Sequence, residues 1–350
     1  MMKLEKQKDL VLAGPGTPAG TYLRSFWQPV ALSREIAEQL HRLKIMNEDL
    51  VAYRDGETVR LLSNRCPHRG TTLHTGRRRP NGHIQCAYHG WTFNGEGQCV
   101  AQPCEPAGST MASRMRIASY PTLEMHGLVF AYMGTGAPPL FPRPEHADRV
   151  DGVHNANVVT WNCNYFQCLE NNPDPMHTAF THPSMKLWTK SVPKFEIEET
   201  DYGIHMRAIR GDYVRNTYFR LPNVLSITNE YWEPPTHVTT WIVPVDDTHA
   251  LTFRYFFTPA PNLLVRLKAH FAWRFLQSRL DAVVDEDKLV QEGQGVIADR
   301  SLEHLGHSDR GVVILRRRFQ EGMRSIGGGP SSHQGGPVQA VPNEAPVLES

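Results

Sequence analysis

The sequence predicts an α+β protein with an N-terminal all-β domain and a second domain in which helices cover an antiparallel sheet. Between residues 26 and 136, short β-type runs alternate with Asp-Gly, Asn-Gly and other turn signals. The Pro-rich stretch GAPPLFPRPEH comes next and is predicted to be a linker between the two domains. Beyond it, strand-like alternation from 195 to 258 is followed by two helical patterns, which is the composition of an α+β domain.

The all-β prediction for residues 26–136 rests on a first strand and on three further segments in chain order. The run GPGTPAGTYLRSFWQPVALS crosses the start of this domain. It contains a Gly/Pro turn and a short helix in segment 1–25, and the first strand begins near Phe26. Two hairpins are predicted in DLVAYRDGETVRLL and GHIQCAYHGWTFNGEGQCV, and GLVFAYM predicts a further strand. We expect segment 1–25 to pack on the second domain.

The second domain is predicted to span residues 137–325. In WNCNYFQCLENNPDPMHTAFTH, apolar and metal-capable residues recur at helical spacing, and the two prolines predict a broken helix. Runs such as HVTTWIVPV and ALTFRYFF predict strands, and long helices are expected near 262–289 and 309–324. The tail 326–350 is rich in Gly, Pro and Ser, so we expect it to be disordered.

Charge and hydropathy narrow the classes of partner. The 350 residues suffice for two cores, and 37 basic residues nearly balance 36 acidic ones. This balance favours a small molecule or a protein as partner over nucleic acid or a membrane. The first fourteen residues mix charges into their apolar run, and no apolar stretch approaches the roughly 20 residues of a membrane span. We expect a soluble, cytoplasmic protein.

Two short motifs place a thiol and an imidazole on each of two turns. They read Cys66-Pro-His68 and Cys86-Ala-Tyr-His89, with seventeen residues between His68 and Cys86. In a reducing compartment such a set indicates a metal rather than a disulfide. Two sulfurs can bind one iron of a [2Fe–2S] cluster and two imidazoles the other. Zinc also accepts two Cys and two His, but zinc fingers group the two cysteines together, so this pattern resembles the Rieske motif.

The other four cysteines have no ligand-type pattern and are expected to be ordinary thiols: Cys99, Cys104, Cys163 and Cys168. High-potential Rieske proteins carry an extra disulfide at positions occupied here by Thr71 and Tyr88. The motif therefore resembles the lower-potential group of oxygenases and their ferredoxins. Near it, the run Arg77-Arg78-Arg79 is either a solvated loop or a surface that docks an acidic electron donor.

A second group of metal-capable residues begins with His177 and His182. Five residues apart on a regular helix, the two imidazoles would point in different directions, so a local kink is required for both to reach one metal. With one carboxylate they would form the facial triad of non-haem Fe(II) oxygenases. The spacing leaves four carboxylates open as the third ligand: Asp281, Asp285, Glu286 and Asp287.

Taken together, these motifs resemble the Rieske non-haem iron oxygenase α subunits, in particular the phthalate-dioxygenase-like branch. The resemblance extends over GPGTPAGTYLRSFWQPVALS, both Cys/His motifs, LENNPDPMHTAFTH and VDEDKLVQEGQGVIADRSLEHLGHSDRGVVILRRR. It implies a Rieske domain over 26–136 and a helix-grip-like catalytic domain over 137–325. It also implies that His177 and His182 hold the iron and that Asp287 is the carboxylate ligand.

Two further residues acquire roles from the resemblance. Asp174 matches the aspartate that links the two metal centres of neighbouring subunits in a trimer, and it would then contact His68 or His89 of an adjacent chain. A turn or helix-capping role is the alternative for Asp174. Asn171 matches an asparagine that often lies near the iron, and a structural amide is its alternative.

The resemblance implies a terminal oxygenase that receives NAD(P)H electrons from a flavin- or ferredoxin-type reductase and uses O₂ to dihydroxylate an aromatic substrate, as a homotrimer or hexamer. Monooxygenation or O- or N-demethylation is the main alternative, and a pure electron-transfer protein or a zinc module is less favoured. The substrate is expected to be carboxylated from the branch resemblance, and its carboxylate would need a guanidinium partner. Five arginines are candidates: Arg207, Arg210, Arg215, Arg220 and Arg254. Three histidines of the same segment are expected to be structural or exposed: His205, His237 and His249.

Overall fold

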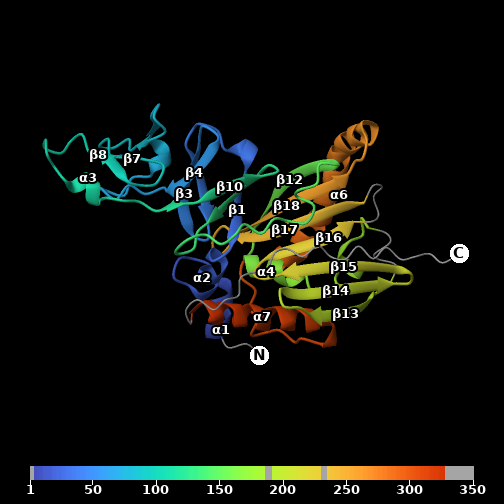
Figure 1. Ribbon diagram of the computed structural model, residues 1–350. Helices are drawn as coiled ribbons and strands as arrows, with labels where there is room; N and C mark the ends of the chain where they lie inside the picture. Colours follow the sequence, from blue (N-terminus) through green and yellow to red (C-terminus); the bar gives the residue numbers. More distant parts are fainter. Residues whose placement is uncertain (1–3, 186–190, 230–234, 328–350) are drawn as a thin grey trace.

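Small sheets in the N-terminal part of the chain adjoin one large sheet in the C-terminal part (Figure 1). The computed structural model describes residues 4–185, 191–229 and 235–327. Both parts are built from antiparallel strands, and helices cover the large sheet. The predicted α+β fold class is confirmed.

Three sheets make up the N-terminal region, residues 27–132. Their strand orders are β1-β11-β10, β2-β3-β4-β9 and β5-β6-β7-β8. The strands are β1 (Trp27–Leu32), β2 (His41–Ile45), β3 (Glu48–Asp55), β4 (Thr58–Ser63), β5 (Arg77–Arg78), β6 (Ile84–Gln85), β7 (Thr92–Phe93), β8 (Cys99–Ala101), β9 (Ser119–Tyr120), β10 (Thr122–Met125) and β11 (Leu128–Tyr132). Short helical turns join them: η1 (Ser33–Glu35), η2 (Leu73–Thr75) and α3 (Met111–Arg114).

The two predicted hairpins are present in this region. Asp55 pairs with Thr58 at the turn between β3 and β4, where Gly56 has a φ of 61° that glycine adopts without strain. Strands β7 and β8 pair across the Asn-Gly turn. The sheet that contains β7 and β8 lies at the end of the N-terminal region farthest from the large sheet (Figure 1).

The large sheet has seven strands in the order β12-β18-β17-β16-β15-β14-β13, so that the chain meanders from β13 to β18 and β12 forms one edge. Its strands are β12 (Gly152–Trp161), β13 (Lys194–Glu199), β14 (Gly203–Arg210), β15 (Tyr213–Arg220), β16 (Val224–Asn229), β17 (Thr236–Pro244) and β18 (Ala250–Pro259). Every neighbouring pair is antiparallel.

The two faces of the large sheet bury different partners because successive side chains on a strand point to opposite faces. On one face, Trp241 packs edge-on against Phe130 of the N-terminal region, with ring centroids 5.3 Å apart. On the opposite face, Phe256 packs against Trp273 of a long helix at 4.8 Å. The long helix on this second face also carries Asp287, a residue of the second metal centre described below.

The helices agree with the sequence patterns. Helix α4 (Tyr165–Asn171) ends where the Pro-containing segment begins, and α5 (Thr178–Thr181) is a separate short turn, so the predicted break is present. The two long helices are α6 (Leu263–Gly293) and α7 (Arg310–Gly327), and a short turn η3 (His307–Asp309) precedes α7. Helix α7 runs two residues into the predicted tail, whose remainder, 328–350, lies outside the described residues.

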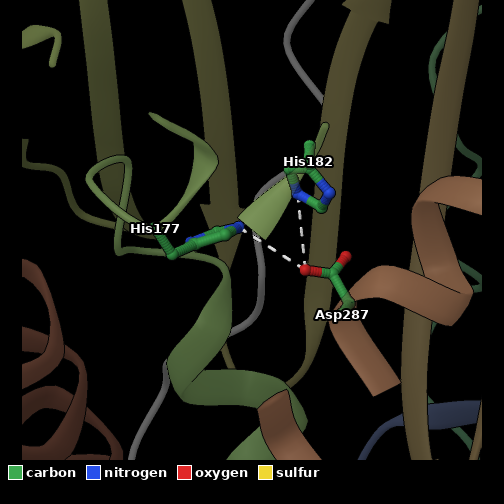
Figure 2. Close-up of side chains that lie close together, drawn as sticks. All are labelled: His177, His182 and Asp287. Carbon is green, nitrogen blue, oxygen red and sulfur yellow. Dashed lines mark ion pairs between the residues drawn. The ribbon is translucent and has the colours of Figure 1, made fainter. Parts of the chain in front are cut away.

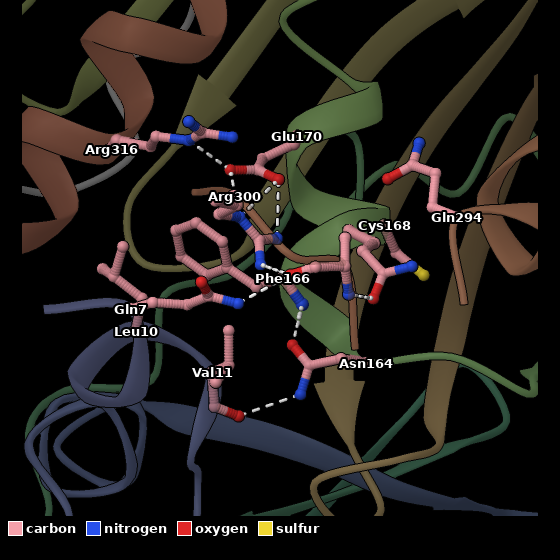
Figure 3. Close-up of polar contacts among 12 residues, drawn as sticks. Gln7, Leu10, Val11, Asn164, Phe166, Cys168, Glu170, Gln294, Arg300 and Arg316 are labelled. Atoms are coloured by element: carbon pink, nitrogen blue, oxygen red, sulfur yellow. Dashed lines mark hydrogen bonds and ion pairs between the residues drawn. The ribbon is translucent and has the colours of Figure 1, made fainter. Parts of the chain in front are cut away.

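A buried polar network fixes α4 against the C-terminal elements (Figure 3). Arg300 is fully buried and its Nη2 lies 2.7 Å from Glu170 of α4, which also accepts from Arg316 of α7. The N-terminal helices α1 (Leu4–Val11) and α2 (Pro18–Arg24) join this frame, since Gln7 donates to the Ala298 carbonyl. Such a network holds α4 rigidly, and α4 leads directly into the metal-capable segment. In the part of the chain that the structure describes, no helix is long and apolar enough to cross a membrane.

Candidate metal centres

The two Cys/His motifs lie on two turns with the same backbone pattern. In each turn, the N–H of Cys66 or Cys86 donates to the carbonyl five residues later, at 2.9 and 2.8 Å. The glycine four residues after each cysteine, Gly70 or Gly90, donates back to the cysteine carbonyl at 2.9 and 3.2 Å. Both glycines have positive φ, 77° and 72°, which explains the glycine in each motif.

The four predicted ligands converge at the tip of these turns. The Cys66 and Cys86 thiols are buried, and burial raises the pKa of Cys66 to about 11, with a further contribution from the neighbouring Cys86 thiol. The His68 and His89 rings lie 4.5 Å apart, and His89 Nδ1 is buried without a hydrogen-bond partner among the described residues. Adjacent buried thiols beside an unpartnered imidazole nitrogen fit the donor set of a [2Fe–2S] cluster.

The surface around this tip carries aromatic and basic side chains. His68 and Tyr88 are exposed, and the Arg69 guanidinium lies 5.3 Å from the centre of the Tyr88 ring. Of the three consecutive arginines, the first and third are exposed and Arg78 is ion-paired with Asp55 at 3.4 Å. The tip is therefore accessible to another protein.

The histidines of the second group lie at opposite ends of α5. His177 caps the start of this short helix and His182 follows its end with non-helical dihedrals of −109° and 69°. This departure from helical geometry supplies the predicted kink, and the two ring centroids lie 5.4 Å apart. Helix α5 is thus too short to separate the two imidazoles.

Asp287 of α6 completes the second group (Figure 2). Its Oδ1 lies 3.6 Å from His177 Nε2 and 3.4 Å from His182 Nε2. Among the described residues, these three form the one set of His, Cys and carboxylate side chains whose ligand atoms all lie within 4.8 Å of one another. Two imidazoles and one carboxylate on one side of a common point fit a divalent iron with open positions.

The other acidic candidates have different surroundings. Glu286 accepts from His182 Nδ1 at 3.1 Å and from the Ser184 hydroxyl at 2.9 Å, so it lies behind the imidazole. Asp285 is largely exposed, and Asp281 lies 3.5 Å from a buried arginine. The alternatives that the spacing left open are thereby separated by geometry. The sequence offers Glu286 only as a possible ligand, whereas in the structure the Glu286 carboxylate orients the His182 ring.

The charge state of His182 suits a metal ligand. Burial lowers the pKa of this imidazole and outweighs the nearby Asp287 carboxylate, which acts in the opposite direction. His182 is therefore neutral near pH 7, as metal coordination requires.

An amide pair supports Asp287 from the side of α4. Asn171 Nδ2 donates to Asp287 Oδ1 at 3.2 Å, and Gln291 Nε2 donates to Asn171 Oδ1 at 2.9 Å. Because Gln291 supplies a donor, the Asn171 oxygen must face it and the Asn171 nitrogen must face the carboxylate. Gln291 is not among the residues predicted from the sequence, although its position one helical turn after Asp287 places it on the same face of α6.

Asp174 lies on the opposite side of His177 from Asp287. Its Oδ1 accepts from the Met176 backbone N–H at 2.8 Å, and its Oδ2 lies 3.7 Å from His177 Nδ1. Burial opposes ionisation of Asp174, but its contacts with His177 and the backbone lower its pKa, so the carboxylate is charged at neutral pH. The turn contact and the proximity to His177 occur together in one conformation.

The candidate arginines differ in burial. Each lies on a strand of the large sheet: Arg207, Arg210, Arg215, Arg220 and Arg254. Arg207 forms an exposed ion pair with Glu196 at 2.6 Å, and Arg210 donates to the Thr178 hydroxyl at 2.6 Å. Arg254 is the buried member of the five. Three histidines have neighbouring partners, as expected for structural residues: His205 with Asn216, His237 with Thr228 and His249 with Asp246.

Comparisons with known proteins identify the domain at the N-terminal end and the relatives of the whole chain. Residues 26–121 match the family model of the Rieske [2Fe-2S] domain. The chain is 30% identical over 365 residues to the 5,5'-dehydrodivanillate O-demethylase oxygenase subunit of Sphingobium sp., covering 94% of this chain and 82% of the relative. It is 32% identical over 359 residues to the phenoxybenzoate dioxygenase subunit alpha of Ectopseudomonas oleovorans, covering 92% and 86%.

Another relative and one solved structure complete the comparison. The phthalate 4,5-dioxygenase oxygenase subunit of Pseudomonas putida is 30% identical over 382 residues, covering 89% of this chain and 85% of the relative. The terminal oxygenase of carbazole 1,9a-dioxygenase from Novosphingobium sp. KA1 superposes with a TM-score of 0.73 at 22% identity, covering 92% and 97% of the two chains. The last comparison supports the fold described above.

Proposed function

Because this chain belongs to the α subunits of Rieske non-haem iron oxygenases, in the branch that resembles phthalate dioxygenase, we propose that it oxygenates an aromatic carboxylate. We propose that residues 26–136 form the electron-transfer domain and that residues 137–325 form the catalytic domain. The observation that carries the proposal is the convergence of His177, His182 and Asp287 from two separate helices.

In this proposal, His177, His182 and Asp287 hold the mononuclear iron, and the residues around them keep the three ligands in place. Glu286 fixes the ring of His182, and Asn171 holds the Asp287 carboxylate from the other side. When bound, the iron activates O₂ beside the substrate, using electrons supplied through the cluster. The chain contributes orientation and exclusion of water, since His182 is buried and Asp287 is mostly shielded.

Cys66, His68, Cys86 and His89 hold the [2Fe–2S] cluster in this proposal, and a separate reductase supplies electrons from NAD(P)H. The exposed tip around His68 is the surface available to an electron donor. A cytoplasmic location is also proposed, where thiols such as the free cysteines of this chain stay reduced.

We propose a homotrimer in which Asp174 contacts His68 or His89 of the neighbouring subunit. Two observations support this arrangement. The strands next to the cluster turns lie at the far end of the molecule from α4 and α6, so one chain keeps its two metal groups apart (Figure 1). Asp174 is partly exposed and lies beside His177, which suits a residue that connects the iron site to a neighbour.

The substrate class is proposed from the names of the relatives. The phenoxybenzoate, phthalate and 3-chlorobenzoate dioxygenases are named for aromatic carboxylates, which favours dihydroxylation of such an acid. O-demethylation is the second candidate, because one relative with 94% coverage of this chain is an O-demethylase subunit. The two candidates differ in their product, a cis-dihydrodiol or a phenol with release of formaldehyde.

Turnover of a panel of aromatic acids tests the proposed function. The purified protein is incubated with NADH, a Rieske-oxygenase reductase and ¹⁸O₂, and each acid is analysed by mass spectrometry. Two labelled oxygen atoms in a product indicate dihydroxylation, whereas loss of a methyl group with formaldehyde indicates demethylation. Absence of labelled product and of formaldehyde from every acid, with a reduced cluster present, would contradict the proposal.

A further inference from the structure

Arg254 is exceptional among the buried arginines of the described residues. Four arginine residues have an exposed fraction below one tenth: Arg24 at 7%, Arg254 at 6%, Arg300 at 1% and Arg316 at 8%. Three of them meet a carboxylate within 3.0 Å: Arg24 with Glu48, Arg300 with Glu170 and Arg316 with Glu303. Figure 3 shows how closely Glu170 neutralises two of these guanidinium groups. Arg254 has no comparable partner within the residues that the structure describes.

The contacts of Arg254 leave its charge poorly compensated. Its Nε donates to Asn157 Oδ1 at 2.9 Å, and its Nη2 lies 3.5 Å from Asp281 Oδ1, at the limit of a hydrogen bond. The structure gives Arg254 no third hydrogen bond to a described residue. Burial lowers the pKa of this guanidinium to about 10 in spite of Asp281, and it remains protonated at neutral pH. A buried cation normally requires an anion in closer contact.

The side-chain amide of Asn157, next to Arg254, is a second buried donor group that is not fully satisfied. The residue is 3% exposed and pairs with Arg254 across strands β12 and β18. Its Oδ1 faces the Arg254 guanidinium, which fixes the direction of the amide. Its Nδ2 is buried and has no partner among the described residues. Buried donors of this kind are normally satisfied, so two adjacent under-satisfied donors indicate a missing acceptor.

The carboxylate nearest to Arg254, Asp281, lies on the same helix as the proposed iron ligand Asp287. Arg254 and Asn157 point to the sheet face that α6 covers, because Arg254 meets Asp281 of that helix. Asp281 precedes Asp287 by six residues, which corresponds to about 9 Å along a helix axis. This separation is comparable with the length of a benzoate ring and its carboxyl group placed beside a metal. An acid bound at Arg254 would therefore lie against the helix that carries Asp287.

We propose that Arg254 and Asn157 form the subsite that binds the carboxylate of the aromatic substrate, an inference that rests on the proposed function. Asp281 lies 3.5 Å from the guanidinium and would compete weakly with the incoming acid. A planar guanidinium and a side-chain amide present donors of fixed geometry to the two carboxylate oxygens. Arg254 thus determines specificity for acids over neutral aromatic compounds.

Binding of matched acids and esters to the iron-loaded protein tests this subsite. Benzoate, phthalate and 3-phenoxybenzoate are each titrated by calorimetry alongside their methyl esters. Arg254→Gln should weaken acid binding about 10- to 100-fold, the range expected for a charged hydrogen bond, and leave ester binding unchanged. Arg254→Lys should retain part of the affinity, since lysine keeps the charge and loses the planar fork. Arg207→Gln is the matched control on the same sheet, and it should bind like the wild type.

Asp281→Asn gives a result of opposite sign. Removal of the competing carboxylate should tighten acid binding about two- to fivefold, as expected for a weak, partly exposed ion pair. A purely structural ion pair between Arg254 and Asp281 predicts instead that both variants weaken acid and ester binding equally. The Asp281→Asn variant also decides the matter if Arg254→Gln fails to fold, which circular dichroism and thermal unfolding of that variant would reveal.

Several outcomes would overturn the subsite. Unchanged acid binding by Arg254→Gln would do so, as would a wild-type protein that binds the esters and none of the acids. In both cases the oxygenase function would stand if the wild type still incorporates labelled oxygen. Failure of the proposed function is separately visible as an absence of labelled product and of formaldehyde, whatever the binding results are.

Discussion

The two groups of proposed metal ligands differ in how the chain assembles them. The ligands of the first group all lie in the short segment from Cys66 to His89, whose two turns repeat one backbone pattern. They are therefore close to one another in sequence. In the second group, His182 follows α5 and Asp287 lies in α6, and six of the seven strands of the large sheet separate them in sequence. A local pattern is therefore enough to assemble the first group, whereas the second forms only when the complete second domain has folded.

The largest expected effect is loss of the second group with the first intact. Asp287→Ala should reduce product formation by more than about 100-fold, because one of three iron ligands is lost. The cluster spectrum should remain unchanged, since the turns around Cys66 do not depend on α6. Oxygen-dependent product formation and electron paramagnetic resonance measure the two effects. Asp285→Ala is the control on the exposed side of α6, and turnover retained by Asp287→Ala would point to Asp285 or Glu286 as the ligand.

The reverse substitution separates the two groups from the other side. Cys86→Ala should eliminate the Rieske signal and reductase-driven turnover, while the iron bound at His177 and His182 persists. Iron analysis with a nitric oxide complex of the mononuclear site measures this retention. Cys104→Ala, at an exposed thiol outside the motif, is the control and should keep both centres. Loss of both kinds of iron from Cys86→Ala would show that the groups do not assemble independently.

A smaller effect is expected from the residue that orients His182. Glu286→Gln keeps the size of the side chain and removes its charge, so iron affinity should fall about 10-fold. Competition with a chelator gives this affinity directly. Asp285→Asn removes the adjacent charge without touching the imidazole, and its iron affinity should match the wild type. An equal loss in both variants would indicate general electrostatics in place of orientation by Glu286.

The smallest effect concerns the amide pair. Gln291→Leu removes the donor that fixes the Asn171 amide, and we expect iron affinity or turnover to fall about threefold. Asn171→Ala should give a larger loss, since it removes the direct contact with Asp287. If Gln291→Leu had the stronger effect, its role would lie in packing α4 against α6. Thermal unfolding of the two variants would identify that case.

The difference between local and long-range assembly of the two ligand groups explains which of their residues the sequence could predict. The spacing of one cysteine and one histidine in each motif was sufficient to propose the cluster ligands, because that chemistry is local. Alternation and prolines predicted the strands and the break before α5. The spacing of four carboxylates did not select Asp287, and the family resemblance was required. Gln291 and the unsatisfied state of Arg254 depend on strand register and on helix packing, which no short sequence pattern specifies.

Iron analysis of the purified protein, combined with electron paramagnetic resonance of its reduced form, tests the central claim of two distinct iron centres most directly. We predict about three iron atoms per chain and a Rieske signal, with about two iron atoms and the same signal in Asp287→Ala. A colourless protein that binds zinc and lacks the Rieske signal would contradict the account.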